Sequence, residues 1–274
     1  MKNFLTRSLT GFVFVFIILG SLLLGEISYA IVFGAILIGA LIEFYSFFKS
    51  GQYQPNKSLG FVSGLVIFIV LFLTATDIIA AEWSFCLFPL VLLSFIFEIY
   101  RERTTPIENI AITIFSILYI ALPLGLVNSM VFPVYEDSRH FNPDILIAVL
   151  SIIWIYDSAA YMVGISFGRH RLLERISPKK SWEGTIGGAI IAVASSYVVS
   201  IFIPEISFMN WIVLTSLIVL AATFGDLFES LIKRNVGLKD SSNLLPGHGG
   251  ILDRFDSLFF AIPVVVLYLK LIIE

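Results

Sequence analysis

The stretch ISFMNWIVLTSLIVLAATFG, residues 206–225, decides the fold of this chain. It contains no Asp, Glu, Lys or Arg, and an uncharged run of about 20 residues is what an α-helix needs to cross a bilayer. Four further runs without these residues can each supply a span, at 8–25, 58–76, 109–135 and 184–204. The hydrophobic fraction is 58%, compared with roughly 45–50% in globular domains. The sequence therefore predicts a polytopic membrane protein.

Apolar runs and the polar, Pro or Gly residues that interrupt them predict an all-α fold with about nine transmembrane helices. The expected helices lie near residues 8–25, 28–48, 59–80, 83–100, 108–132, 144–167, 185–203, 208–232 and 256–273. Lys2 and Arg7 precede the first run, as in a secretory signal, but no small-residue cleavage site follows. We therefore expect a retained first helix.

The distribution of basic residues predicts the orientation of these helices. Lys and Arg are enriched in the cytoplasmic loops of membrane proteins. With the N-terminus in the cytoplasm and nine alternating helices, 15 of the 17 Lys and Arg lie on the cytoplasmic side, and only Arg139 and Lys270 lie outside. The sequence therefore predicts a cytoplasmic N-terminus and a C-terminus outside.

Polar residues are distributed unequally along the chain, which suggests a division near residue 140. Residues 1–140 have short loops and few polar residues within their helices, so we interpret them as scaffold helices. Residues 141–274 carry the two largest cytoplasmic loops, 168–184 and 233–255, and acids within the predicted spans. We expect this second part to be the catalytic region.

A polar stretch, SLIKRNVGLKDSSNLLPGHGGILDRFD, occupies residues 230–256 after the quoted helix. Placing such charges beside apolar helices is costly unless a ligand or metal offsets them. Its glycines let main-chain N–H groups approach an anion, and its basic side chains can neutralise phosphate oxygens. These residues are Gly247, Gly249, Gly250, Lys233, Arg234, Lys239 and Arg254. The pattern indicates a phosphate-binding loop.

Two carboxylates of this loop are candidate ligands for Mg²⁺, which prefers carboxylate and phosphate oxygens. Asp253 and Asp256 lie three residues apart and would share one face of a helix that begins there. Asp226 ends an uncharged run, and Asp157 lies within a predicted helix. Acids within or at the edge of a membrane are functional candidates by default.

A second basic segment lies in the loop GRHRLLERISPKKSWEG, residues 168–184. Lys179, Lys180 and Ser181 directly precede a predicted helix, whose first N–H groups could also hold an anion. Attraction to lipid headgroups alone would explain the other basic residues of this loop.

Three residues in the first half have simpler interpretations. Glu43 and Glu98 lie near cytoplasmic helix ends, so we expect them to extend into the headgroup region. The single cysteine, Cys86, excludes an intramolecular disulfide, and we expect it to be a buried, inert thiol.

From the residues alone, the sequence predicts a membrane enzyme with a cytoplasm-facing pocket for a metal-bound polyphosphate. Apolar helices beside this pocket could admit a lipid. Such a site would catalyse phosphoryl or nucleotidyl transfer by positioning and charge neutralisation rather than through a protein nucleophile.

The 230–256 stretch resembles the complete signature of the phosphatidate cytidylyltransferases, also called CDP-diacylglycerol synthases. The matching positions are Ser230, Ile232, Lys233, Arg234, Lys239, Asp240, Ser242, Leu245, Pro246, His248, Gly249, Gly250, Asp253, Arg254 and Asp256. Segments 157–161, 177–184 and 225–226 are similar to other blocks of this family, so the resemblance covers about residues 154–260.

The resemblance implies transfer of CMP from CTP to phosphatidate, giving CDP-diacylglycerol and pyrophosphate. It implies Mg²⁺ as the cofactor and leaves a second cation open. It also implies a multi-pass protein of the bacterial inner (cytoplasmic) membrane, with its active site facing the cytoplasm. A homodimer is implied as well, and we expect no nucleic-acid partner.

Roles for individual residues follow as a hypothesis from the same resemblance. The catalytic residues would be Lys239, Asp240, His248 and Arg254. The substrate-binding residues would be Lys179, Lys180, Ser181, Lys233, Arg234, Gly247, Gly249 and Gly250. The metal ligands would be Asp226, Asp253, Asp256 and Asp157. His248 could either donate to pyrophosphate or order the loop.

Two other functions stay open at this point. A CTP-dependent lipid kinase would use similar residues to transfer the γ-phosphoryl group to a lipid alcohol. An ion-coupled transporter would also carry acids within the membrane. A CDP-alcohol phosphotransferase is disfavoured, because the sequence has no D-G-x-x-A-R run.

Overall fold

A computed structural model describes residues 2–48, 52–135, 138–238, 241–242 and 249–272, with only the backbone at residues 2–8, 134–135 and 138. The chain divides into two compact units. The first comprises Met1–Asn142 and Asp240–Arg254, and the second comprises Pro143–Lys239 and Phe255–Glu274. The expected division into scaffold helices, 1–140, and a catalytic region, 141–274, stays a prediction.

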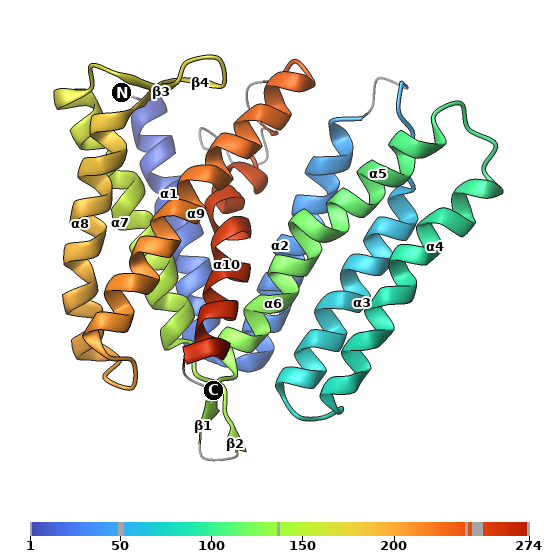
Figure 1. Cartoon of the computed structure of the whole chain (residues 1–274), viewed down its shortest axis with the longest axis horizontal. Helices are drawn as coiled ribbons and strands as arrows, with labels where there is room; N and C mark the ends of the chain where they lie inside the picture. The colour runs from blue at the N-terminus through green and yellow to red at the C-terminus, as the bar shows by residue number, and fades with distance from the viewer. Residues whose placement is uncertain (1, 49–51, 136–137, 239–240, 243–248, 273–274) are drawn as a thin grey trace. The chain divides into compact units, whose positions relative to one another are not determined.

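The first unit is built from helices that pack against chain neighbours and, between α3 and α6, against a more distant helix. Its elements are α1 (Lys2–Leu24), α2 (Glu26–Ser46), α3 (Lys57–Ala75), η1 (Ala81–Leu87), α4 (Phe88–Ile99), α5 (Pro106–Ser116), η2 (Ile117–Ala121), α6 (Leu122–Val131), β1 (Val134–Tyr135) and β2 (Ser138–Arg139). Figure 1 shows α5 beside both α3 and α4, in agreement with the contacts that α5 makes with each. The segments α5, η2 and α6 form one span, Pro106–Val131, which contains a π-helical turn at η2.

Two buried polar side chains of the first unit, Tyr29 and Asn128, form hydrogen bonds with each other and with the backbone. The Tyr29 hydroxyl donates to Oδ1 of Asn128 over 2.8 Å, and Asn128 Nδ2 donates to the carbonyl of Gly125 over 2.8 Å. Such pairing is required among apolar helices, because an unsatisfied polar group is costly there.

Two expectations about α4 and η1 are wrong. The Glu98 side chain is buried rather than extended toward headgroups, because it accepts hydrogen bonds from Arg101 and from Asn109, each over 2.7 Å. Cys86 is exposed rather than buried, since it lies in η1, none of whose residues is buried within the chain.

The second unit contains α7 (Asp144–Phe167), β3 (Arg171–Leu173), β4 (Ser177–Ser181), α8 (Trp182–Phe202), α9 (Phe208–Asn235) and most of α10 (Leu252–Ile272). Figure 1 shows α7 and α8 side by side, joined by the β3–β4 hairpin at one end. The hairpin is antiparallel, with Arg171 opposite Ser181 and Leu173 opposite Ser177. α9 packs against both α7 and α8.

Small residues bring the backbones of α7 and α8 into direct contact. A Cβ atom added to Gly188 would lie 2.8 Å from the Cβ atom and 2.9 Å from the backbone nitrogen of Ala160. A Cβ atom added to Gly184 would lie 2.7 Å from the Ala160 carbonyl oxygen and 3.0 Å from Cα of Gly164. Small residues at helix interfaces permit close packing in membranes, where the hydrophobic effect does not drive helix association.

The prediction of an all-α polytopic membrane protein is confirmed. Within the described residues, eight helical segments are long and apolar enough to cross a membrane, and the described apolar part of α1 is Leu9–Leu24. α8 begins at Trp182, ahead of the expected residue 185, because the Ser181 hydroxyl caps the helix by accepting from the Gly184 N–H over 3.2 Å. The orientation of the termini stays a prediction.

The α7–α8 contact gives a prediction for stability. Gly188→Ala should destabilise the protein by about 1–3 kcal/mol, because the new methyl group meets backbone atoms that cannot move independently. Gly20→Ala is the matched control, since a Cβ atom there has no neighbour within 4 Å. Thermal unfolding in detergent micelles measures both variants. Equal midpoints for the two would contradict the proposed role of this contact.

Candidate functional site

A polar cavity of about 670 Å³ lies in the second unit, where α7, the β3–β4 hairpin, α8 and α9 each contribute residues. Its walls include five of the residues that the sequence predicted for substrate or metal binding. These are Asp157, Lys179, Lys180, Ser181 and Asp226. Residues from three separate segments of the sequence therefore line one cavity.

An ion pair joins two of these segments. Nζ of Lys180 on β4 lies 2.5 Å from Oδ2 of Asp226 on α9. The side chains remain 26% and 32% exposed, so both are accessible from the cavity. The Ser230 hydroxyl lies 3.4 Å from Oδ1 of Asp226. A lysine in this setting can exchange a carboxylate partner for a phosphate oxygen, because it acts as a point charge with rotatable donors.

A close approach of two backbones places Asp256 near this ion pair. A Cβ atom at Gly225 on α9 would lie 2.5 Å from the Asp256 carbonyl oxygen and 3.1 Å from Cα of Ser257. Only glycine permits this approach, which explains a glycine directly before Asp226. Asp226 and Asp157 act electrostatically on Asp256, and so does Lys180. Asp157 and Asp226 line the cavity together with Lys180, so two carboxylates beside one amine favour a bound cation there.

This donor set fits Mg²⁺ only if other ligands complete its coordination. In the described part of the chain, no group of three His, Cys, Asp or Glu side chains is placed to hold a metal ion by itself. Mg²⁺ is commonly held by one or two carboxylates together with phosphates and waters. The second unit therefore offers carboxylates of the right chemistry, and a phosphate substrate would have to supply further oxygens.

The described parts of the signature in the first unit are ordered by Asp253. Its carboxylate accepts hydrogen bonds from the Ser241 N–H over 3.0 Å, the Ser241 hydroxyl over 2.9 Å and the Gly250 N–H over 2.8 Å. Gly249 has a φ of 79°, a left-handed conformation that favours glycine. A Cβ atom at Gly249 would also meet the Asp253 carboxylate. These glycines thus permit a compact turn around Asp253.

Glu43 is the residue at this turn that the sequence analysis missed. The expectation that it extends into the headgroups is wrong, because the residue is only 4% exposed. It accepts hydrogen bonds from the Ser242 hydroxyl over 2.5 Å and from the backbone N–H groups of Ile251 and Leu252 over 2.9 Å each. These donors lie about 200 residues further along the chain, so no local pattern could have indicated the contact. An acid inside an apolar helix was the available signal.

The other predicted substrate-binding residues differ in their surroundings. Lys233 is buried and pairs with Glu229 over 2.5 Å, so binding a substrate would require this ion pair to open. Arg234 and Arg254 are exposed, and Arg234 donates to the Leu238 carbonyl over 3.2 Å. The predicted residues Lys239, Asp240, Gly247 and His248 lie outside the described residues.

Glu183 stabilises the turn between α7 and the hairpin. Its carboxylate accepts the backbone N–H of Arg169 over 3.1 Å and that of His170 over 3.2 Å, and Nδ1 of His170 lies 2.6 Å from it. The position of Lys180 along the hairpin therefore depends on Glu183 as well as on the Ser181 cap.

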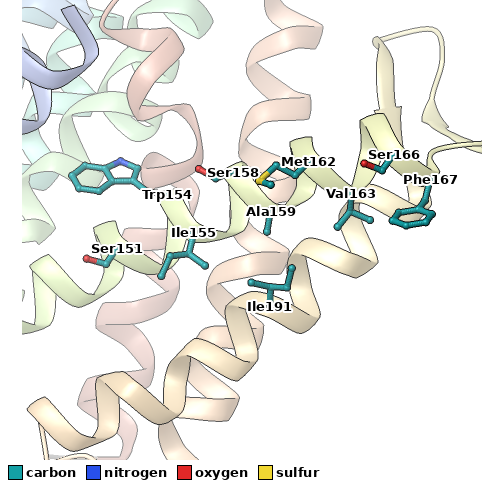
Figure 2. A pocket seen from close by; sticks show the side chains of 10 residues that line it. All are labelled: Ser151, Trp154, Ile155, Ser158, Ala159, Met162, Val163, Ser166, Phe167 and Ile191. Atoms are coloured by element: carbon teal, nitrogen blue, oxygen red, sulfur yellow. The ribbon is translucent and has the colours of Figure 1, made fainter. Parts of the chain in front are cut away.

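An apolar groove of about 770 Å³ lies along α7 and α8 (Figure 2). Trp154, Ile155 and Met162 line it from α7, and Ile191 lines it from α8. A second apolar cavity of about 540 Å³ shares Ile155 with it and continues along the same two helices. Because α7 also carries Asp157 in the polar cavity, one helix contributes to both an apolar and a polar binding surface.

Comparisons with known proteins agree on one family. Residues 5–272 match the model described as "Cytidylyltransferase family". A phosphatidate cytidylyltransferase of Staphylococcus haemolyticus is 32% identical over 266 residues, which cover 94% of this chain and 96% of the relative. The enzyme of that name from Thermotoga maritima is 35% identical over 178 residues, 63% of each chain.

The Haemophilus influenzae relative, also named phosphatidate cytidylyltransferase, is 43% identical over 134 residues. That match covers 47% of this chain and 46% of the relative, so the chain spans less than two thirds of this relative and of the Thermotoga one. The family model, by contrast, extends over nearly the entire sequence. On this ground, the chain belongs to the cytidylyltransferase family.

Proposed function

We propose that this protein is a phosphatidate cytidylyltransferase, which transfers CMP from CTP to phosphatidate in phospholipid biosynthesis. The observation that carries the proposal is the Lys180–Asp226 ion pair in a polar cavity that shares α7 with an apolar groove. The charged lining of the polar cavity suits the phosphates of a nucleotide, and the apolar groove suits the acyl chains of a lipid. Membership of the family and the names of its relatives support the same reaction.

In the proposed reaction, a phosphate oxygen of phosphatidate attacks the α-phosphorus of CTP in line with the leaving group. The new phosphorus–oxygen bond forms as the bond to the bridging oxygen breaks, and pyrophosphate leaves. A phosphate monoester is already ionised at neutral pH, so no strong general base is required. Lys179 and Lys180 would bind the phosphates and neutralise their charge. For Arg254, a role in the reaction stays what the family resemblance implies.

Asp226 and Asp256, with Asp157 nearby, would hold the proposed Mg²⁺ ion. A bound Mg²⁺ ion would supply further neutralisation of phosphate charge. Asp253 also stays a proposed metal ligand, although hydrogen bonds from Ser241 and Gly250 already occupy its carboxylate.

The apolar groove on α7 and α8 would receive the acyl chains of phosphatidate. A lipid lying there would stay within the membrane while its headgroup reached the polar cavity on the same helix. The inner membrane, the cytoplasm-facing site and the homodimer stay proposals that rest on the family resemblance.

The products of the reaction test this function directly. Purified protein in detergent micelles with CTP, Mg²⁺ and phosphatidate should release pyrophosphate and form CDP-diacylglycerol in equal amounts. Release of CDP from CTP and a lipid alcohol would instead favour a lipid kinase. Absence of turnover with either lipid, combined with ion-driven uptake in vesicles, would favour a transporter.

Removing single carboxylates tests the metal assignment. Asp226→Asn and Asp256→Asn should each lower kcat by about 100-fold or more and raise the Mg²⁺ concentration needed for half-maximal rate. Glu205→Gln, an acid-to-amide change at an exposed position of the same unit, should leave both quantities unchanged. An unchanged Mg²⁺ requirement in Asp226→Asn would overturn the assignment.

Asp253→Asn gives a separate outcome in the same assay. If Asp253 is a metal ligand, Asp253→Asn should raise the Mg²⁺ concentration needed for half-maximal rate, as Asp226→Asn does. A lower kcat with an unchanged requirement would restrict Asp253 to ordering the turn.

Filling the groove tests the lipid site. Ile191→Trp should raise KM for long-chain phosphatidate by about tenfold, which corresponds to roughly 1.4 kcal/mol, while KM for CTP stays unchanged. Ile190→Trp is the matched control, because Ile190 is exposed on the same helix but does not line the groove. Equal effects of the two substitutions on KM would contradict the site.

A further inference from the structure

Glu43 is a buried carboxylate whose described hydrogen-bond donors all belong to the signature stretch. The residue lies near the end of α2, and its side chain reaches the Ser241 and Ser242 hydroxyls and the N–H groups of Ile251 and Leu252. It therefore contacts two described parts of the signature, residues 241–242 and 249–254. We call these two parts the flanks, because they border residues 243–248 within the signature.

The charge of Glu43 is balanced by these donors rather than by a basic side chain. Among the described residues, no Lys or Arg forms a salt bridge with it. The Ile251 and Leu252 N–H groups lie at the start of α10, where the helix dipole favours a negative charge. Hydrogen bonds to an ionised acceptor are about twice as strong as neutral ones.

Burial makes this contact selective for one arrangement of the flanks. A buried carboxylate without donors is costly, and here the described donors come from residues that must be in place together. The flanks and Glu43 thus stabilise one conformation, and displacing either flank leaves the charge of Glu43 under-solvated.

A second carboxylate joins the same network. The Ser241 hydroxyl lies 3.1 Å from Oε2 of Glu43 and 2.9 Å from Oδ2 of Asp253. A Cβ atom at Gly250 would meet both the Ser241 hydroxyl and the Glu43 carboxylate, so the packing leaves no room for a side chain. Glu43 therefore explains why the signature requires glycine at position 250.

We propose that Glu43 is a positioning residue for the proposed nucleotidyl transfer, because it holds both flanks of the signature against α2. The inference rests on the proposed function and assigns a role to a helix outside the signature. In this role, Glu43 would act through its protein partners and not by binding a substrate. It acts through the backbone of residues 249–252 and so sets the position of Arg254, two residues beyond Leu252. Small displacements of groups that bind a reacting phosphate can cost about 100-fold in rate.

Glu43→Gln is the sharpest test because it preserves shape. The amide nitrogen of glutamine is a donor, so the backbone N–H of Ile251 or Leu252 would lose its acceptor, and the serine hydroxyl beside it would have to reverse its hydrogen bond. We expect kcat to fall by about tenfold or more, with KM for CTP and for phosphatidate within about threefold of wild type. Glu43→Asp keeps the charge but shortens the side chain, so it should retain more activity than Glu43→Gln.

Glu98→Gln is the matched control. Glu98 is equally buried, lies near a helix end in the same unit and loses comparable hydrogen bonds to Asn109 and Arg101. It has no described contact with residues 241–254. The control should lower thermal stability as Glu43→Gln does while leaving kcat within about threefold of wild type.

Hydrogen exchange separates positioning from general stability. In the intact protein in micelles, the amides of residues 249–254 should exchange faster in Glu43→Gln than in wild type. In Glu98→Gln, their exchange rates should equal those of wild type. Ser242→Ala combined with Glu43→Gln should cost less than the sum of the two single effects, since both remove one network.

Three results would overturn the inference: near-wild-type kcat in Glu43→Gln, unchanged exchange of residues 249–254, or an equal kcat loss in Glu98→Gln. A separate result would show that the proposed function is wrong: the wild-type protein would form neither CDP-diacylglycerol nor pyrophosphate. In that case the exchange measurement still decides whether Glu43 holds the flanks.

Discussion

A charged side chain among apolar helices is stable only when a partner is placed beside it, and this constraint shapes each polar cluster of the protein. Glu98 pairs with Arg101 and Asn109, and Lys233 pairs with Glu229. Glu43 is balanced by N–H and hydroxyl groups instead. The Lys180–Asp226 pair differs because it faces a cavity and remains partly exposed. An ion pair that is accessible in this way can exchange one partner for a ligand, whereas a buried ion pair stabilises the fold.

Close backbone contacts bring these charges together. Gly184 and Gly188 allow α8 to lie against α7, and the hairpin between the two helices carries Lys180. Gly225 allows α9 to approach the backbone at Asp256, next to Asp226. At the signature, Gly250 leaves space for the Glu43 carboxylate and the Ser241 hydroxyl, and Gly249 leaves space for the Asp253 carboxylate. The glycines of this family pattern therefore act mainly by leaving space, so that polar groups from distant segments can meet.

The proposed reaction makes separate demands on the two units. The second unit supplies the polar cavity and the apolar groove, both built partly on α7. The first unit supplies α2, whose Glu43 holds the described flanks of the signature. A helix in the half of the chain that the sequence presented as scaffold thus has a part in ordering the residues of the proposed reaction.

The sequence by itself determined the all-α membrane fold, because spans of apolar residues and the charges between them are local properties. It also indicated Asp157, Lys180 and Asp226, which line one cavity, since polar residues in apolar surroundings stand out without any knowledge of contacts. Only the tertiary structure decided the partners of Glu43 and Glu98, and the exposure of Cys86. The partners of Glu43 lie about 200 residues away, and whether a buried acid is paired depends on how helices pack, which no periodicity records.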